Sequence, residues 1–127
     1  GAKTFNALDD FDVFVHEIHH KHKKDSPSGT ALTTAEIIVK HIDRKKDIVT
    51  ERLDRAPEPH EIHVSSTRGG DVFGDHIVTF DSPDGTIEIT HKSKGRSGYA
   101  QGAINCAKWL SQKEGFYTID DYLKEIF

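Results

Sequence analysis

The sequence predicts an α+β fold, in which a mixed sheet of about four strands carries helices on one face. Three observations lead to this prediction. A segment rich in β-branched and aromatic residues comes first, an amphipathic helix pattern follows, and three strand-like segments then precede a second helix. A helix that joins two strands of one sheet is a crossover, so part of the sheet should be parallel. The face without helices is left open, and we expect it to serve oligomerisation.

The first half of the chain predicts one strand and one helix. Residues 2–8 fit the end of a helix, and residues 11–20, FDVFVHEIHH, predict a strand. Residues 21–29, KHKKDSPSG, combine Asp, Ser, Pro and Gly and therefore predict a loop. Residues 30–46 predict a helix. Its apolar residues recur at steps of three and four: Leu32, Ala35, Ile38, Val39 and Ile42.

The second half predicts three strands and a closing helix. Residues 47–59 are polar and contain two prolines, so they predict mostly connection. Strands are expected over 61–68, 72–80 and 87–92, and the turn SPDG before the last of them is typical of a hairpin.

A helix over 99–112 should place its apolar residues inward, and residues 120–127 predict a short helix that needs a packing partner. The inward set is Ala100, Ala103, Ile104, Ala107 and Leu110.

Composition excludes several classes of protein. The chain has 127 residues, enough for the single domain that we expect over 1–127. It has 17 basic against 21 acidic residues, a balance that disfavours a nucleic-acid partner. No apolar run approaches the length of about 18 residues that a membrane span needs. A single cysteine, Cys106, excludes an internal disulfide and favours a reducing compartment, so we expect a cytoplasmic location.

The loop after the first strand carries the residues with the most chemistry. His19 and His20 end the strand, Lys23 follows within the loop, and Ser28 or Asp25 can cap the next helix. Free N–H groups at a helix start attract anions, and the glycine that follows Ser28 lets a ligand approach the backbone. A lysine adds positive charge and a histidine exchanges a proton near neutral pH. The loop therefore predicts a carboxylate or phosphate site with a built-in acid.

Other interpretations of this loop remain open. A run such as HHKHKK at 19–24 is also typical of a solvated loop. His19, His20 and His22 suggest zinc, but adjacent residues on a strand point to opposite faces and no cysteine lies nearby, so we expect no metal site. His76 and His91 fall within predicted strands, where we expect packed or exposed rather than catalytic side chains.

Nine positions of this region resemble the signature of the dihydrodipicolinate reductases. They are Glu17, His19, Lys23, Asp25, Pro27, Ser28, Gly29, Thr30 and Ala31. The likeness continues in the arginine-glycine segment 67–76, in the strand 87–92 and in the helix segment 93–110. Together these segments cover most of residues 11–123. The chain is therefore identified as similar to the C-terminal half of this family.

The sequence departs from the family pattern at two points. Phe14 stands where the family usually has a glutamate, a position that precedes the catalytic loop. The family begins with a dinucleotide-binding domain that bears a glycine-rich fingerprint, and residues 1–127 contain no such fingerprint. We therefore expect the nucleotide-binding domain to be missing from this chain and the chain alone to be inactive.

The resemblance implies a reaction and a role for each matching residue. The family reduces dihydrodipicolinate (4-hydroxy-tetrahydrodipicolinate) to tetrahydrodipicolinate with NADPH or NADH, in lysine biosynthesis. His19 matches the general acid, and Lys23 matches the second catalytic residue, which stabilises charge. The remaining matches are to substrate-binding positions: His20, Ser28, Gly29, Thr30 and, more loosely, Arg96. Glu17 and Asp25 match supporting positions.

The resemblance also implies architecture. It points to a domain like the C-terminal domain of glyceraldehyde-3-phosphate dehydrogenase and to a homotetramer built through the open sheet face. Residues 120–127 resemble the segment that returns to the nucleotide domain. Three alternatives stay open: a non-catalytic module for anion binding and oligomerisation, a metal-sequestering histidine loop, and a related reductase with another small acid as substrate.

Overall fold

The computed structural model describes residues 1–127 and separates into two units, residues 1–93 and residues 94–127. The first unit contains two helices and a sheet, and the second contains two helices. The elements of the first unit are α1 (Ala2–Asn6), β1 (Asp12–His19), α2 (Gly29–His41), β2 (Asp47–Val49), β3 (Glu61–Arg68), β4 (Asp75–Ser82) and β5 (Gly85–Lys92). Those of the second are α3 (Ser97–Leu110) and α4 (Ile119–Ile126). No helix has the length and apolar character needed to cross a membrane.

The sheet is mixed, as predicted, but it has five strands rather than about four. Their order is β2-β3-β1-β4-β5. The additional strand, β2, pairs in parallel with the start of β3. It lies in the stretch that the sequence predicts as connection, and its three residues are too few to show an alternating pattern.

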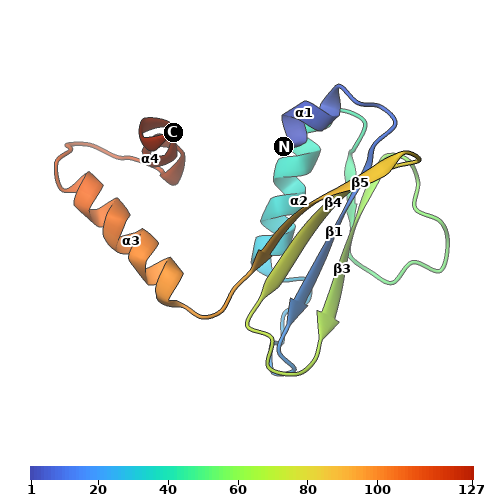
Figure 1. The fold of residues 1–127 in the computed structure, drawn as a ribbon, viewed down its shortest axis with the longest axis horizontal. Helices are drawn as coiled ribbons and strands as arrows, with labels where there is room; N and C mark the ends of the chain where they lie inside the picture. Colours follow the sequence, from blue (N-terminus) through green and yellow to red (C-terminus); the bar gives the residue numbers. More distant parts are fainter. The chain divides into compact units, whose positions relative to one another are not determined.

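The helix α2 is the predicted crossover. It connects β1 to the β2–β3 pair, and β1 and β3 are parallel, whereas β4 runs antiparallel to both β1 and β5. Helices α1 and α2 lie on the same face of the sheet (Figure 1). Because β1 and β3 are parallel neighbours, they end side by side, at His19 and Arg68. This end of the sheet is where the loop with the predicted site begins.

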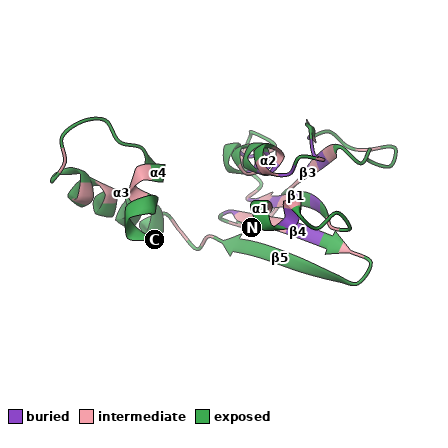
Figure 2. Cartoon of the chain, turned by 90° about the horizontal axis from the view of Figure 1, so that it is seen from above, coloured by how far each residue is buried: buried purple, intermediate pink, exposed green.

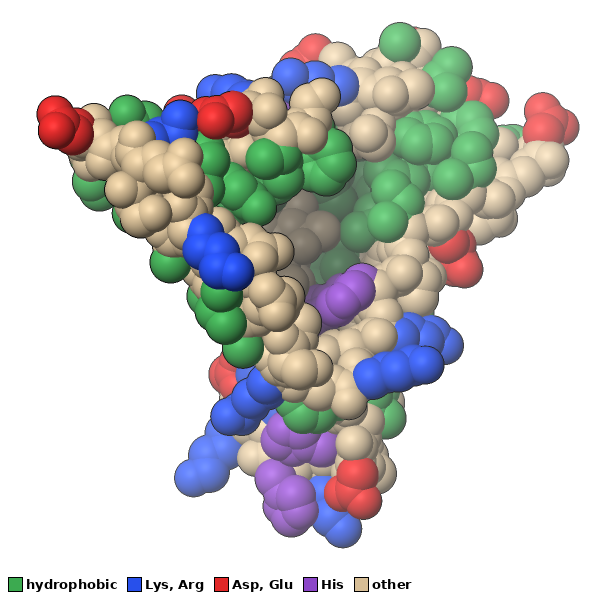
Figure 3. Space-filling model, turned by 60° about the vertical axis from the view of Figure 1, so that its left-hand side comes forward, with side chains coloured by type: hydrophobic (Ala, Val, Ile, Leu, Met, Phe, Trp, Pro, Cys, Tyr) green, Lys and Arg blue, Asp and Glu red, His purple; other side chains and the backbone are tan.

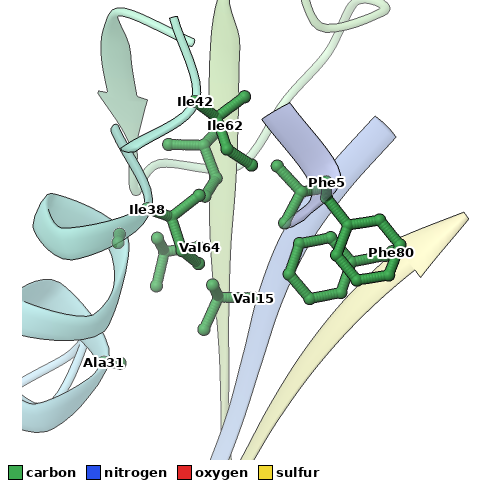
Figure 4. Close-up of a cluster of buried hydrophobic side chains, with 10 residues drawn as sticks. Phe5, Val15, Ala31, Ile38, Ile42, Ile62, Val64 and Phe80 are labelled. Atoms are coloured by element: carbon green, nitrogen blue, oxygen red, sulfur yellow. The ribbon is translucent and has the colours of Figure 1, made fainter. Parts of the chain in front are cut away.

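The hydrophobic core lies between α2 and the face of the sheet on which α1 and α2 lie. Alternation along each strand points every second side chain at the helix. Phe80 anchors the core, because its ring stacks on Phe5 of α1 at a centroid distance of 3.9 Å (Figure 4). The other buried members are Val13, Val15, Ala31, Ala35, Ile38, Ile42, Ile62 and Val64. Buried residues lie on β1, α2, β3 and β4, and β5 is exposed throughout (Figure 2).

Helix α2 ends earlier than the predicted residue 46, because the residues after it are held by the buried polar contacts of Lys45. Ile42 leaves the helix with an extended backbone, φ −121° and ψ 101°. Lys45 is then buried, with its Nζ 2.6 Å from the Asp12 carboxylate and within hydrogen-bond distance of the Pro59 and Glu61 carbonyls. This cation, which looked like part of a helix in the sequence, fixes the chain between α2, β1 and β3.

The second unit confirms both predicted helices but not the predicted inward face. Helix α3 has no buried residue within this unit, so the expectation that its alanines and leucine face inward is not met there. The contact between α3 and α4 is aromatic: the Trp109 ring lies 5.3 Å from the Tyr117 ring and 5.4 Å from the Tyr122 ring, edge to face. Thr118 and Asp121 form a capping box that starts α4.

Candidate active site

The candidate site continues the buried face of β1 beyond the apolar core. Every second side chain of the strand is buried on this face: Val13, Val15, Glu17 and His19. The apolar part of the face ends at Val15, and Glu17 and His19 add polar groups to it. Glu17 lies opposite Ser66 on β3 and His76 on β4, and His19 lies opposite Arg68 on β3. Three strands therefore bring charged and hydrogen-bonding groups to one end of the sheet.

Glu17 is the centre of this arrangement. Its side chain is 0% exposed, and its carboxylate accepts two hydrogen bonds from Arg68, at 2.7 and 2.9 Å. It also accepts from the Ser28 amide at 3.1 Å and from Nδ1 of His19. Burial by itself raises the pKa of Glu17, but the Arg68 guanidinium and the hydrogen bonds from His19 and Ser28 outweigh it and lower this pKa to about 2. Glu17 is therefore a buried anion at neutral pH.

This anion orients His19. Because Nδ1 is bonded to the ionised Glu17, Nδ1 carries a hydrogen and Nε2 is the ring nitrogen left to face a ligand. Gly74 lies beside that atom: a Cβ at residue 74 would stand 2.9 Å from Nε2. The glycine therefore keeps space next to Nε2 of a histidine whose ring is otherwise buried.

Arg68 also holds the loop that follows β1. Its Nη2 donates to the Asp25 carbonyl at 2.6 Å, so one guanidinium bridges Glu17 and the turn before α2. The Asp25 carboxylate pairs with Nζ of Lys23 at 2.8 Å, a contact that lowers the pKa of Asp25. Glu17 and Asp25, which the sequence predicts as supports, thus orient a histidine and a lysine respectively.

The start of α2 presents its amides next to this network. Ser28, rather than Asp25, is the N-cap: its Oγ accepts from the Ala31 amide at 3.2 Å. The amides of Gly29 and Thr30 lie in the first turn of the helix, where backbone N–H groups have no partner within the helix, and neither has another acceptor within residues 1–127. Both residues are exposed, whereas Ser28 is buried. The helix start therefore offers two free N–H groups and its macrodipole to an anion.

The basic part of the loop after β1, residues 20–24, lies next to the start of α2. His20 is half-buried and accepts the Lys23 amide at its carbonyl, which forms a tight turn after β1. The rings of His20 and His22 lie 6.2 Å apart, and no group of three His, Cys, Asp or Glu residues within 1–127 is placed to hold a metal ion. Lysine, arginine and histidine side chains gather at the lower end of the view in Figure 3.

One residue of the site, His76, was missed in the sequence, and one predicted residue, Arg96, belongs to the other unit. Nε2 of His76 lies 3.0 Å from Oγ of Ser28, and its ring stands edge-on to His19 at 5.2 Å. Burial, and next the nearby His19, lower the pKa of His76. The sequence places His76 in a strand but gives no register, and register is what brings it opposite Glu17. Arg96 lies in the second unit, exposed at the start of α3, so its role stays a prediction.

Comparison with known proteins identifies relatives of this chain. The family model for the C-terminus of dihydrodipicolinate reductase matches residues 2–123. The 4-hydroxy-tetrahydrodipicolinate reductase of Archaeoglobus fulgidus is 46% identical over 122 residues, which cover 92% of this chain and 48% of that protein. The enzyme of the same name from Aquifex aeolicus is 48% identical over 115 residues, covering 89% and 43%. The chain thus spans about half the length of these relatives.

A solved structure is also similar to this chain. It is a dipicolinate-bound dihydrodipicolinate reductase from Paenisporosarcina sp. TG-14, with 26% identity and a TM-score of 0.60, and the match covers 81% of this chain and 42% of that one. Sequence and structure therefore lead to the same conclusion. The chain belongs to the dihydrodipicolinate reductase family and corresponds to its C-terminal domain.

Proposed function

We propose that the full-length protein reduces 4-hydroxy-tetrahydrodipicolinate to tetrahydrodipicolinate in the cytoplasm, and that this chain is its substrate-binding half. The observation that carries the proposal is the pairing of a Glu17-oriented histidine with a helix start whose first amides are free. A proton donor and an anion site side by side suit a planar substrate with two carboxylates. The names of the relatives, and the dipicolinate bound to the similar structure, support the same substrate class.

The nicotinamide cofactor, NADPH or NADH, supplies the hydride in this reaction. Residues 1–127 do not fit it: β1 enters α2 through residues 20–28, which contain no glycine, whereas a dinucleotide turn needs a glycine-rich loop after a strand. We therefore propose that the cofactor binds to residues outside this chain. The steps proposed for this chain concern only the carboxylates and the proton.

Each site residue then has a defined task. The amides of Gly29 and Thr30 bind one carboxylate, with the Ser28 and Thr30 hydroxyls as further donors. Lys23 adds positive charge, and Asp25 holds its ammonium in place. After the 4-hydroxyl of the substrate has left as water, hydride transfer produces an enamine, and His19 delivers a proton to it from Nε2 while Glu17 stabilises the charged ring. His20 and Arg96 are proposed as additional substrate contacts.

The open sheet face is proposed as the surface of a homotetramer. Its residues on β1 include Phe14, which is 41% exposed, and Ile18, which is half-buried. Exposed apolar side chains on a sheet face are stabilised when a second copy covers them. If the full-length protein binds dicarboxylates and assembles in this way but catalyses no reduction, it is instead a non-catalytic module for anion binding and oligomerisation.

Replacing His19 by alanine in the full-length protein should lower kcat about 100-fold or more and leave KM little changed, because the acid acts in the chemical step. Oxidation of the reduced cofactor in the presence of 4-hydroxy-tetrahydrodipicolinate measures both constants. His22→Ala, in the same loop, is the control and should behave like the wild type. Unchanged turnover in His19→Ala would refute the acid assignment.

Lys23→Ala should raise KM and lower kcat together, by roughly tenfold each, because the ammonium acts on both the bound and the reacting substrate. Lys24→Ala removes a neighbouring exposed lysine and should change neither constant by more than about twofold. Steady-state kinetics at two salt concentrations separate a local contact from a general charge effect. Equal losses in both variants would contradict a specific role for Lys23.

Glu17 should also make stability depend on pH. Its pKa lies at about 2 when folded against 4.5 as the ordinary value, so its stabilisation is complete above pH 4.5 and is lost as the pH falls towards 2. The loss should reach about 2 kcal/mol at pH 3. Urea unfolding of the wild type and of Glu17→Gln at pH 6 and pH 3 measures it.

In that comparison the wild type should lose about 2 kcal/mol more than Glu17→Gln on acidification, because only the wild type has the buried carboxylate to protonate. Glu36→Gln alters an exposed glutamate on α2 and should follow the wild type. Parallel losses in the wild type and Glu17→Gln would show that Glu17 does not ionise as described.

A further inference from the structure

His76 lies within the site but has no task in the reaction described above. It stands on β4 directly opposite Glu17, half-buried, with its Nε2 3.0 Å from Oγ of Ser28. Its ring meets the His19 ring edge-on at 5.2 Å. It thus contacts both parts of the site, the cap of the anion-binding helix and the proton donor.

The bonding of Ser28 indicates what this contact can do. A serine hydroxyl has one hydrogen to donate and two lone pairs to accept with. One lone pair of Ser28 takes the Ala31 amide at 3.2 Å. If the second takes the Nε2–H of His76, the hydroxyl hydrogen has no remaining task inside the protein. It is then free to point at a carboxylate that rests on the neighbouring amides of Gly29 and Thr30.

We propose that His76 is a positioning residue of the substrate site, which donates from Nε2 to the Ser28 oxygen and so directs the Ser28 hydroxyl at the bound carboxylate. The inference rests on the proposed function, because it needs a carboxylate at the start of α2. It adds a residue on β4 to a site otherwise drawn from β1, β3 and the loop between β1 and α2.

The charges around His76 agree with this role. Burial, followed by the proximity of His19, lowers the pKa of His76, so its ring is neutral at neutral pH. A neutral imidazole carries one hydrogen, and placing it on Nε2 gives Ser28 its donor. Neutrality also avoids two positive rings 5.2 Å apart when His19 holds the proton that it transfers. His76 is in this way a donor to Ser28 and not a second acid.

The test compares affinities of the full-length protein for pyridine-2,6-dicarboxylate by calorimetry. His76→Phe keeps a ring but removes the donor, and should weaken binding about tenfold. His76→Gln restores an N–H donor and should bind within about twofold of the wild type. His91→Phe changes the exposed histidine opposite His76 on β5 and should have no effect. Thermal unfolding checks that each variant is folded.

A double-mutant cycle asks whether His76 acts through Ser28. Ser28→Ala should weaken binding about tenfold, and adding His76→Phe to it should cost little more. Additive losses, or a His76→Phe variant that binds like the wild type, would overturn the proposal. If wild-type protein does not bind the dicarboxylate, the proposed function fails with it; if it binds and His76→Phe is unaffected, only this inference fails.

A measurement without variants covers the case in which His76→Phe does not fold. Long-range ¹H–¹⁵N spectra of the dicarboxylate-bound protein report which ring nitrogen of each histidine carries hydrogen. We expect hydrogen on Nε2 of His76. A His76 ring with hydrogen only on Nδ1 would overturn the proposal, because Ser28 would then have to donate to it.

Discussion

The site depends on one buried charge, the carboxylate of Glu17. An ion without water is unstable in a protein unless it is fully bonded, and Glu17 meets this condition with the guanidinium of Arg68, the ring of His19 and the amide of Ser28. These partners come from β3, from β1 itself and from the start of α2. A single carboxylate therefore connects the end of the sheet, His19 and the start of α2, which are the proposed proton donor and the proposed anion site.

The apolar and the polar part of the buried sheet face have different roles. The apolar face built from α1, α2 and the sheet supplies stability, with Phe80 stacked on Phe5 and the aliphatic side chains packed around them. The polar extension of that face supplies orientation. Because Nδ1 of His19 is bonded to Glu17 and Arg68 also donates to the Asp25 carbonyl, His19 and the loop before α2 are held in place by contacts within the protein itself. Preorganised groups of this kind lose little entropy when a ligand binds.

Most of the fold could be predicted from the sequence, and the failures have physical causes. The β-branched and aromatic residues of segment 11–20 predicted β1, and the three- and four-residue spacing predicted α2. The strand β2 was missed because three residues show no period, and the end of α2 was placed too late because Lys45 looks like a surface lysine until its buried contacts are seen. In the candidate site, the signature residues indicated the loop and the helix start, and the roles assigned to them stay predictions. His76 could not be found, because its contact with Ser28 arises from strand register, which local sequence patterns do not encode.

The most direct test is a crystal structure of the full-length protein with pyridine-2,6-dicarboxylate. The account predicts one carboxylate within hydrogen-bond distance of the Gly29 and Thr30 amides, Nε2 of His19 facing the ligand ring, and Arg68 still paired with Glu17. If Arg68 instead leaves Glu17 to bind the ligand, the buried carboxylate does not organise the site. A ligand bound away from the start of α2 would contradict the account as a whole.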